Sequence, residues 1–182
     1  VWMLDNGLRS GVTPKLVAWD SLGDALHQVI YLPPPATVDG SFVNDLAVDI
    51  PNDAVYITDP ASGKDAALIV VDLETGLSRR VLEGHETVTP EEVDFAIDGE
   101  PVRRNGNTPR VGVNPIVLDA QGEFVYFGPM TGHSLYRVRT ANLLDNSLTA
   151  EDLAAQVERY SEKPICDGIS IDRMNNVYIT DL

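Results

Sequence analysis

Three short polar openings contain the residues of this 182-residue sequence that are best suited to binding. Asn44 and Asp45 precede the apolar run LAVD, Asn114 precedes PIVLD, and Asp167 precedes GISID. Amide and carboxylate oxygens accept hydrogen bonds from ligands, and they are the ligands that a hard cation such as Ca²⁺ prefers. Asn and Asp also begin strands and turns for purely local reasons. Their recurrence at one position of a repeat favours a shared site as much as a local role.

The openings belong to a sequence unit that recurs along the chain. Its copies read NDLAVDIPNDAVYITD, NPIVLDAQGEFVYFGP and CDGISIDRMNNVYITD, with a half copy VWMLD; they begin at Asn44, Asn114, Cys166 and Val1. Units of roughly 40 to 50 residues, made of short β-rich runs separated by turn residues, are typical of four-stranded propeller blades. The sequence therefore predicts an all-β propeller of antiparallel blades. In such a fold the openings would converge at one mouth of the central channel.

The repeat divides the chain into blade segments at about residues 1–43, 44–111, 112–165 and 166–182, within one partial propeller domain. These segments amount to about three to three and a half blades, so we expect remaining blades of the same chain to close the ring. Glu83 to Gly112 interrupts the pattern and predicts a rim insertion, with a tight turn at Asp98-Gly99. A single short helix is expected from Ala150 to about Gln156, with Thr149 as its cap.

Two further sets of repeated residues are expected to be structural. The aromatic residues share one register of the second strand, which predicts core positions between blades; they are Trp2, Tyr56, Tyr126 and Tyr178. The acidic residues each precede a turn, where an Asp side chain can accept a hydrogen bond from the following backbone; they are Asp49, Asp119 and Asp172.

Composition excludes several classes of partner. The chain has 28 acidic against 13 basic residues and a net charge of −15, whereas binding to a nucleic acid depends on clustered Lys and Arg. No apolar run approaches the roughly 20 residues needed to span a bilayer. The one cysteine, Cys166, cannot form an internal disulfide and is expected to be a small buried residue. The three histidines lack metal-ligand spacing, and the sequence contains no nucleophile elbow or phosphate-binding glycine loop.

Several segments resemble the Yellow/major royal jelly protein family, in particular its bacterial branch, often described as dopachrome-tautomerase-related. They are VWMLDNG, PKLVAWD, FVNDLAVD, ALIVVDL, FAIDGEP, VYFGP, SLYRVRTANLL and EKPICDGISID, in order along nearly the whole chain. The resemblance implies a six-bladed propeller, secreted or periplasmic, that binds a small organic molecule at its central channel. With the convergence expected above, this assigns ligand binding to Asn44, Asp45, Asn114 and Asp167. Enzymatic activity is not general to that family, so the resemblance does not imply one.

A more distant likeness, to gluconolactonase and regucalcin propellers, concerns the same openings. By position, Asn114 and Asp167 match metal ligands of those enzymes, and Asn44-Asp45 matches a pair beside the substrate. This likeness implies an alternative function, a lactonase-like hydrolase. In it a divalent cation such as Ca²⁺ would polarise an ester carbonyl and lower the pKa of an attacking water. A third alternative is an interaction scaffold that binds partners through the Glu83 to Gly112 rim.

Overall fold

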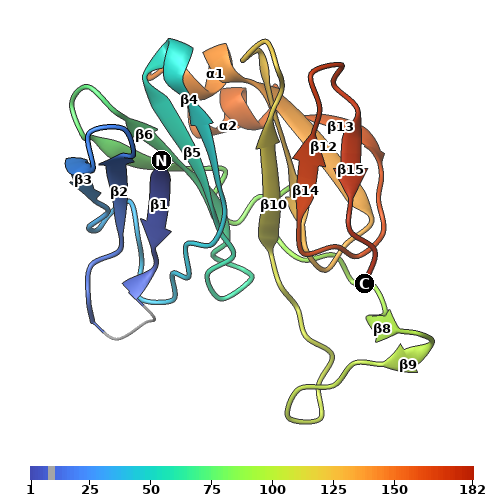
Figure 1. Ribbon diagram of the computed structural model, residues 1–182. Coiled ribbons are helices and arrows are strands. Elements are labelled where there is room, and N and C mark those ends of the chain that lie inside the picture. Colours follow the sequence, from blue (N-terminus) through green and yellow to red (C-terminus); the bar gives the residue numbers. More distant parts are fainter. Residues whose placement is uncertain (8–10) are drawn as a thin grey trace.

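The computed structural model describes residues 1–7 and 11–182 as antiparallel sheets arranged side by side around a shared inner row of strands (Figure 1). The first sheet contains β1 (Trp2–Asp5), β2 (Lys15–Asp20) and β3 (Ala25–Tyr31). The second, called blade 2 here, contains β4 (Leu46–Asp49), β5 (Ala54–Asp59), β6 (Ala67–Asp72) and β7 (Ser78–Val81). Blade 3 contains β10 (Val113–Leu118), β11 (Phe124–Pro129), β12 (Ser134–Arg139) and β13 (Glu158–Glu162). The last sheet pairs β14 (Ile169–Ile171) with β15 (Val177–Ile179). These sheets confirm the all-β architecture of antiparallel sheets that the sequence predicted.

Blade 2 is buried on both faces because its neighbours cover both. Successive residues of a strand point to opposite faces of the sheet. In β5 this places Val55 and Ile57 in one apolar cluster with Leu16, on the side of the first sheet. Tyr56 lies in the other cluster, which includes Phe127 of blade 3. A strand covered on both faces reads as a continuous apolar run, as AVYITD and ALIVVD do.

The helices differ from the expectation in number. The predicted helix is present as α2 (Ala150–Ala154), and Thr149 and Asp152 form the capping box at its start. A second helix, α1 (Thr140–Leu144), was not predicted, so the expectation of a single α-helix was wrong. The start of α1 has no side-chain cap; instead the Thr140 hydroxyl donates to the Gly122 carbonyl at 2.7 Å. Tertiary packing therefore determines this helix, and a local pattern could not reveal it. A 3₁₀ turn, η2 (Ile50–Asn52), follows β4.

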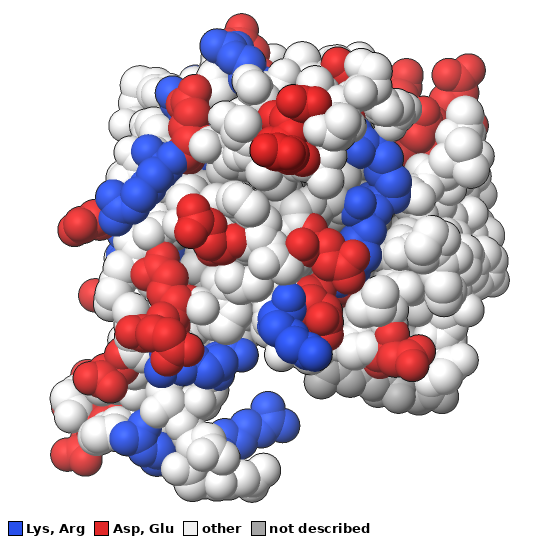
Figure 2. Space-filling view, turned by 180° about the vertical axis from the view of Figure 1, so that it is seen from behind, with Lys and Arg blue, Asp and Glu red and all other residues white. Residues whose placement is uncertain are grey.

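The insertion between blades 2 and 3 forms an arm with its own hairpin, β8 (Ala96–Ile97) and β9 (Glu100–Pro101). The predicted turn is confirmed, because Asp98 and Gly99 both have the positive φ that a two-residue hairpin requires. Arg110 fixes the base of the arm by donating to the carbonyls of Glu91 at 2.8 Å and Val93 at 2.7 Å. Figure 2 shows acidic side chains spread over the body of the molecule and several basic side chains on this projecting segment. No helix in the described part of the chain is long and apolar enough to cross a membrane.

In blade 2 and in the last sheet, the repeated Tyr and Asp residues contact each other, which the sequence did not indicate. The Tyr56 hydroxyl donates to the Asp49 carboxylate at 3.0 Å, and the Tyr178 hydroxyl donates to Asp172 at 2.9 Å. Asp172 also accepts from the backbone of Met174 and Asn176, as expected of a turn residue. Each Tyr therefore ties the start of its strand to the turn before it.

The two pairs differ in burial. Tyr56 and Asp49 are both fully buried, and burial raises the pKa of Tyr56, with the Asp49 carboxylate raising it further. Tyr178 is 59% exposed, so the expectation of a core position was wrong for it. Among the described residues, no strand pairs with the far edge of β15, which leaves its side chains open.

We predict that Tyr56→Phe lowers the free energy of unfolding by about 1–3 kcal/mol, because it deprives a buried carboxylate of a donor. Oδ1 of Asp49 has no hydrogen-bond partner among the described residues, so the loss of the Tyr56 donor is not compensated at that oxygen. Tyr178→Phe is the matched control and should change stability by less than about 0.5 kcal/mol, because water can reach Asp172. Urea denaturation measures both values, and equal losses would contradict this account.

Candidate functional site at the channel mouth

The site lies where the inner strands of neighbouring sheets begin. The strands β4, β10 and β14 run in the same direction, β10 contacts both others, and all three begin at the end from which the arm projects (Figure 1). A shallow, open groove of about 270 Å³ lies along these strands, and most of the residues that line it have apolar side chains. Its lining residues are Leu46, Ala47, Val48, Ile116, Val117, Leu118, Ser170 and Ile171. The polar openings therefore stand together at one end of this row of inner strands.

The structure brings three of the expected site residues into one hydrogen-bonded chain. The Asn44 side-chain amide donates to Oδ1 of Asn114. Nδ2 of Asn114 donates to Asp167 twice, to the carboxylate at 2.5 Å and to the backbone carbonyl at 3.0 Å. Asn114 is buried, whereas Asn44 and Asp167 are exposed and open to the channel end. One buried amide thus connects two accessible polar groups from three successive sheets.

A backbone irregularity places the central amide. The pairing of β10 with β11 shifts register between Val113 and Ile116, which is the position of Asn114-Pro115. Proline has no N–H to offer the ladder, so within a sheet it occurs at edges and bulges. A bulge re-aims the side chain next to it. Pro115 therefore accounts for the local break that accompanies the inward position of Asn114.

Thr58, at the end of β5, is a positioning residue that the sequence reasoning missed. Its buried hydroxyl donates to the Asn114 carbonyl at 2.9 Å and accepts from the Asp45 backbone N–H at 3.1 Å. Its backbone carbonyl accepts from the Asn44 N–H at 3.0 Å. Thr180 holds the equivalent place in VYITD and bonds both backbone groups of Gly168, at 3.2 Å and 3.0 Å. The repeated Thr was the signal that could have identified this role.

Asp45 is half-buried beside the chain of hydrogen bonds. Burial raises the pKa of its carboxyl group, the Leu46 N–H partly offsets this, and the negative charge of Asp167 raises the pKa further. Like charges that share a site disfavour ionisation of one another. The mouth of the channel is therefore a place where a positive charge would be favoured.

These side chains can bind a hard cation only if the amide groups of Asn44 and Asn114 turn over. As the structure stands, Asn114 presents its nitrogen to Asp167, while its oxygen is occupied by Asn44. Turning both amides over keeps their mutual hydrogen bond and directs the Asn114 oxygen toward Asp167. A cation could then lie between that oxygen and the carboxylate, with Asp45 adding negative charge nearby. The chain itself supplies only oxygen ligands here, which suits Ca²⁺ or Mg²⁺ better than a soft metal.

We predict that Thr58→Val destabilises the fold by about 1–3 kcal/mol, because it leaves the Asp45 N–H and the Asn114 carbonyl without a buried partner. Thr58→Ser keeps the hydroxyl and should recover most of that loss. Thermal and urea unfolding give the stabilities, and amide hydrogen exchange at Asp45 reports the local effect. A valine variant with wild-type protection at Asp45 would refute the positioning role.

We predict that Asp45→Asn raises the melting temperature at pH 7. The folded-state pKa of Asp45 lies above its ordinary value of 3.8, so the carboxylate begins to cost stability as the pH rises above 3.8, and the cost is complete once the pH exceeds the raised pKa. The cost disappears below pH 3.8, where the carboxyl group is protonated in both states. The gain from Asp45→Asn should therefore shrink in acid. Asp94→Asn makes the same charge change on the exposed arm and is the control for the loss of one negative charge.

Comparisons with known proteins agree with this architecture. A solved nidogen/laminin complex contains a chain with a TM-score of 0.54 and 13% identity, over 93% of this chain and 49% of that one. Hydrazine synthase from Kuenenia stuttgartiensis gives a TM-score of 0.56 at 10% identity, over 95% of this chain and 53% of that one. The chain thus spans about half the length of either structure, and the likeness extends to the β-propeller fold alone. A search of curated proteins found no match. The family model described as "Major royal jelly protein" matches residues 1–182, and the chain therefore belongs to the major royal jelly protein family.

Proposed function

We propose that this propeller binds a small organic molecule at its channel mouth, and that the ligand carries a positively charged, hydrogen-bond-donating group. The observation that carries the proposal is the chain of hydrogen bonds from Asn44 through Asn114 to Asp167. Asn114 is held from both sides, so the exposed Asp167 carboxylate is oriented before a ligand arrives. Pre-ordered acceptors lose less conformational entropy on binding.

Charge supports the choice of a cationic group. Asp45 and Asp167 are close enough that the charge of Asp167 raises the pKa of Asp45. An ammonium group between them would relieve this repulsion and could donate up to three hydrogen bonds. The groove behind the mouth, which Val48 and Ile116 help to line, would take the hydrocarbon body of the ligand. Family membership leads us also to propose a six-bladed complete ring and a secreted or periplasmic location.

The same like-charge pair favours one second candidate, a cation-dependent hydrolase. In that case Asn114 and Asp167 would hold Ca²⁺ or another divalent ion after the amide reorientation described above. The ion would supply Lewis-acid activation of an ester carbonyl and of a water molecule. Asn44 and Asp45 would then face the substrate.

We predict that phenethylamine raises the melting temperature and that 2-phenylethanol, which has the same body without the charge, does so much less. Asp167→Asn keeps the shape of the side chain but removes the charge, and it should weaken the amine about tenfold. Asp39→Asn removes an exposed charge elsewhere and should leave binding unchanged. Calorimetric titration of the full chain measures the affinities.

Equal binding of amine and alcohol, or amine binding that survives both Asp167→Asn and Asn44→Ala, would reject the ligand-binding proposal. Stoichiometric Ca²⁺ binding that Asp167→Asn abolishes, together with no amine binding, would replace it with the hydrolase. Lactone turnover that depends on added Ca²⁺ would then be the further test.

A further inference from the structure

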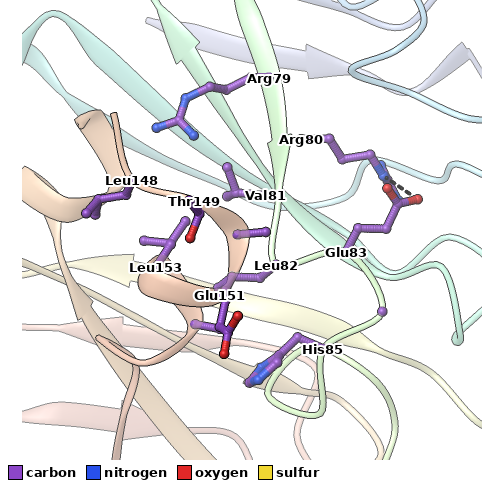
Figure 3. Close-up of a pocket in the computed structure, with 13 residues that line it drawn as sticks. Arg79, Arg80, Val81, Leu82, Glu83, His85, Leu148, Thr149, Glu151 and Leu153 are labelled. Atoms are coloured by element: carbon purple, nitrogen blue, oxygen red, sulfur yellow. Dashed lines mark ion pairs between the residues drawn. The ribbon is translucent and has the colours of Figure 1, made fainter. Parts of the chain in front are cut away.

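A second cavity lies away from the channel, between the outer strand of blade 2 and the helices of blade 3. It has a volume of about 680 Å³, within the range of small-molecule sites. One wall is β7 and the segment that follows it, and the other is α2 with the loop before it (Figure 3). A smaller cavity of about 360 Å³ flanks the same strand beside α1. Arg79 lines both cavities.

The floor of the larger cavity is apolar. Leu153 and Val81 are buried there, and they belong to the core cluster shared by blades 2 and 3. The remaining apolar lining consists of Leu82, Leu148, Ala150 and Ala154. A hydrocarbon or aromatic body placed on this floor would be removed from water without burying polar protein groups. The floor alone selects for an apolar body and not for a particular head group.

The two arginines of β7 have different surroundings because successive side chains of a strand point to opposite faces. Figure 3 shows Arg80 directed toward Glu83, and it also pairs with the buried carboxylate of Asp59 at 2.6 Å. Arg79 is directed the other way, toward the helices. Its guanidinium donates to the Leu143 carbonyl at the end of α1. Among the described residues, no carboxylate forms an ion pair with it.

The electrostatic situation of Arg79 favours an anion. Arg79 is half-buried, and burial lowers the pKa of its guanidinium, whereas the charge of Asp145 raises it. A guanidinium has five N–H donors in a planar fork that matches a carboxylate. The bond to Leu143 uses one of them, so further donors remain toward the cavities. In Figure 3, His85 and Glu151 lie at the opposite end of the cavity from Arg79, so Glu151 does not take the place of an anionic partner.

We propose that this cavity is a second ligand site, which binds an amphipathic carboxylate with its head group on Arg79 and its apolar body along Val81 and Leu153. The site is independent of the channel mouth, because none of its lining residues belongs to the Asn44–Asn114–Asp167 chain. The ligand class is also opposite in charge to the one proposed for the channel.

The test compares 1-naphthaleneacetate with its uncharged amide by calorimetric titration of the full chain. The carboxylate should bind about tenfold more tightly than the amide, and Arg79→Gln should remove that preference. Arg173→Gln makes the same charge change at an exposed position and should preserve it. Asp167→Asn should leave carboxylate binding unchanged, which separates this result from failure of the channel proposal.

A second variant covers the case in which Arg79→Gln does not fold, since Arg79 also bonds the end of α1. Ala150 is exposed and lines the cavity, so Ala150→Trp fills the space while Arg79 stays in place. It should abolish binding of both compounds. The proposal is overturned if the wild type shows no preference for the carboxylate, if folded Arg79→Gln retains that preference, or if Ala150→Trp binds normally.

Discussion

The buried carboxylate of Asp59 is the constraint on which the candidate site depends. It has no exposed surface, so its charge is tolerated only because it is paired and hydrogen-bonded. Arg80 supplies the opposite charge from β7, and Ser41, Phe42 and Ala61 supply further donors at 2.5–3.0 Å. These partners come from three different segments, and each is fixed relative to the end of β5. Removing either charge would leave the other buried and unpaired, which is far more costly than the pair is stabilising.

The contacts of Asp59 are connected to the channel mouth through Thr58, the residue before it. The segment held by Asp59 leads directly into Asn44, whose N–H bonds the carbonyl of Thr58. The hydroxyl of Thr58 then crosses to the Asn114 backbone on blade 3, and the Asn114 side chain continues to Asp167 on the last sheet. Thr58 and Asn114 are buried, so the links that they make would leave buried polar groups without a partner if broken singly. The relative position of three sheets is thereby transmitted to the polar groups at the mouth.

The sequence predicted those features that the repeat makes visible and missed those that depend on contacts between copies. Asn44, Asn114 and Asp167 could be aligned because each occupies the same place in its unit, and equal places converge in a propeller. The α1 helix could not be found, because its start lacks a cap and Thr140 is held by a distant carbonyl. The role of Thr58 was present as a repeated letter, but its partner lies on another blade.

The two proposed sites stand in one electrostatic field and should respond to it in opposite ways. With a net charge of −15 the molecule attracts cations to an acidic mouth and slows the approach of anions. The field is screened beyond about 8–10 Å at physiological ionic strength, so the local charge of Arg79 decides binding once an anion has arrived. Burial strengthens that local interaction by lowering the effective dielectric around the guanidinium. Added salt therefore weakens the attraction of cations to the mouth. At the Arg79 cavity, added salt weakens the repulsion between an anion and the net negative charge of the molecule. An acidic protein can thus hold an anion-selective pocket, provided that the cation is half-buried and not already neutralised by a neighbour.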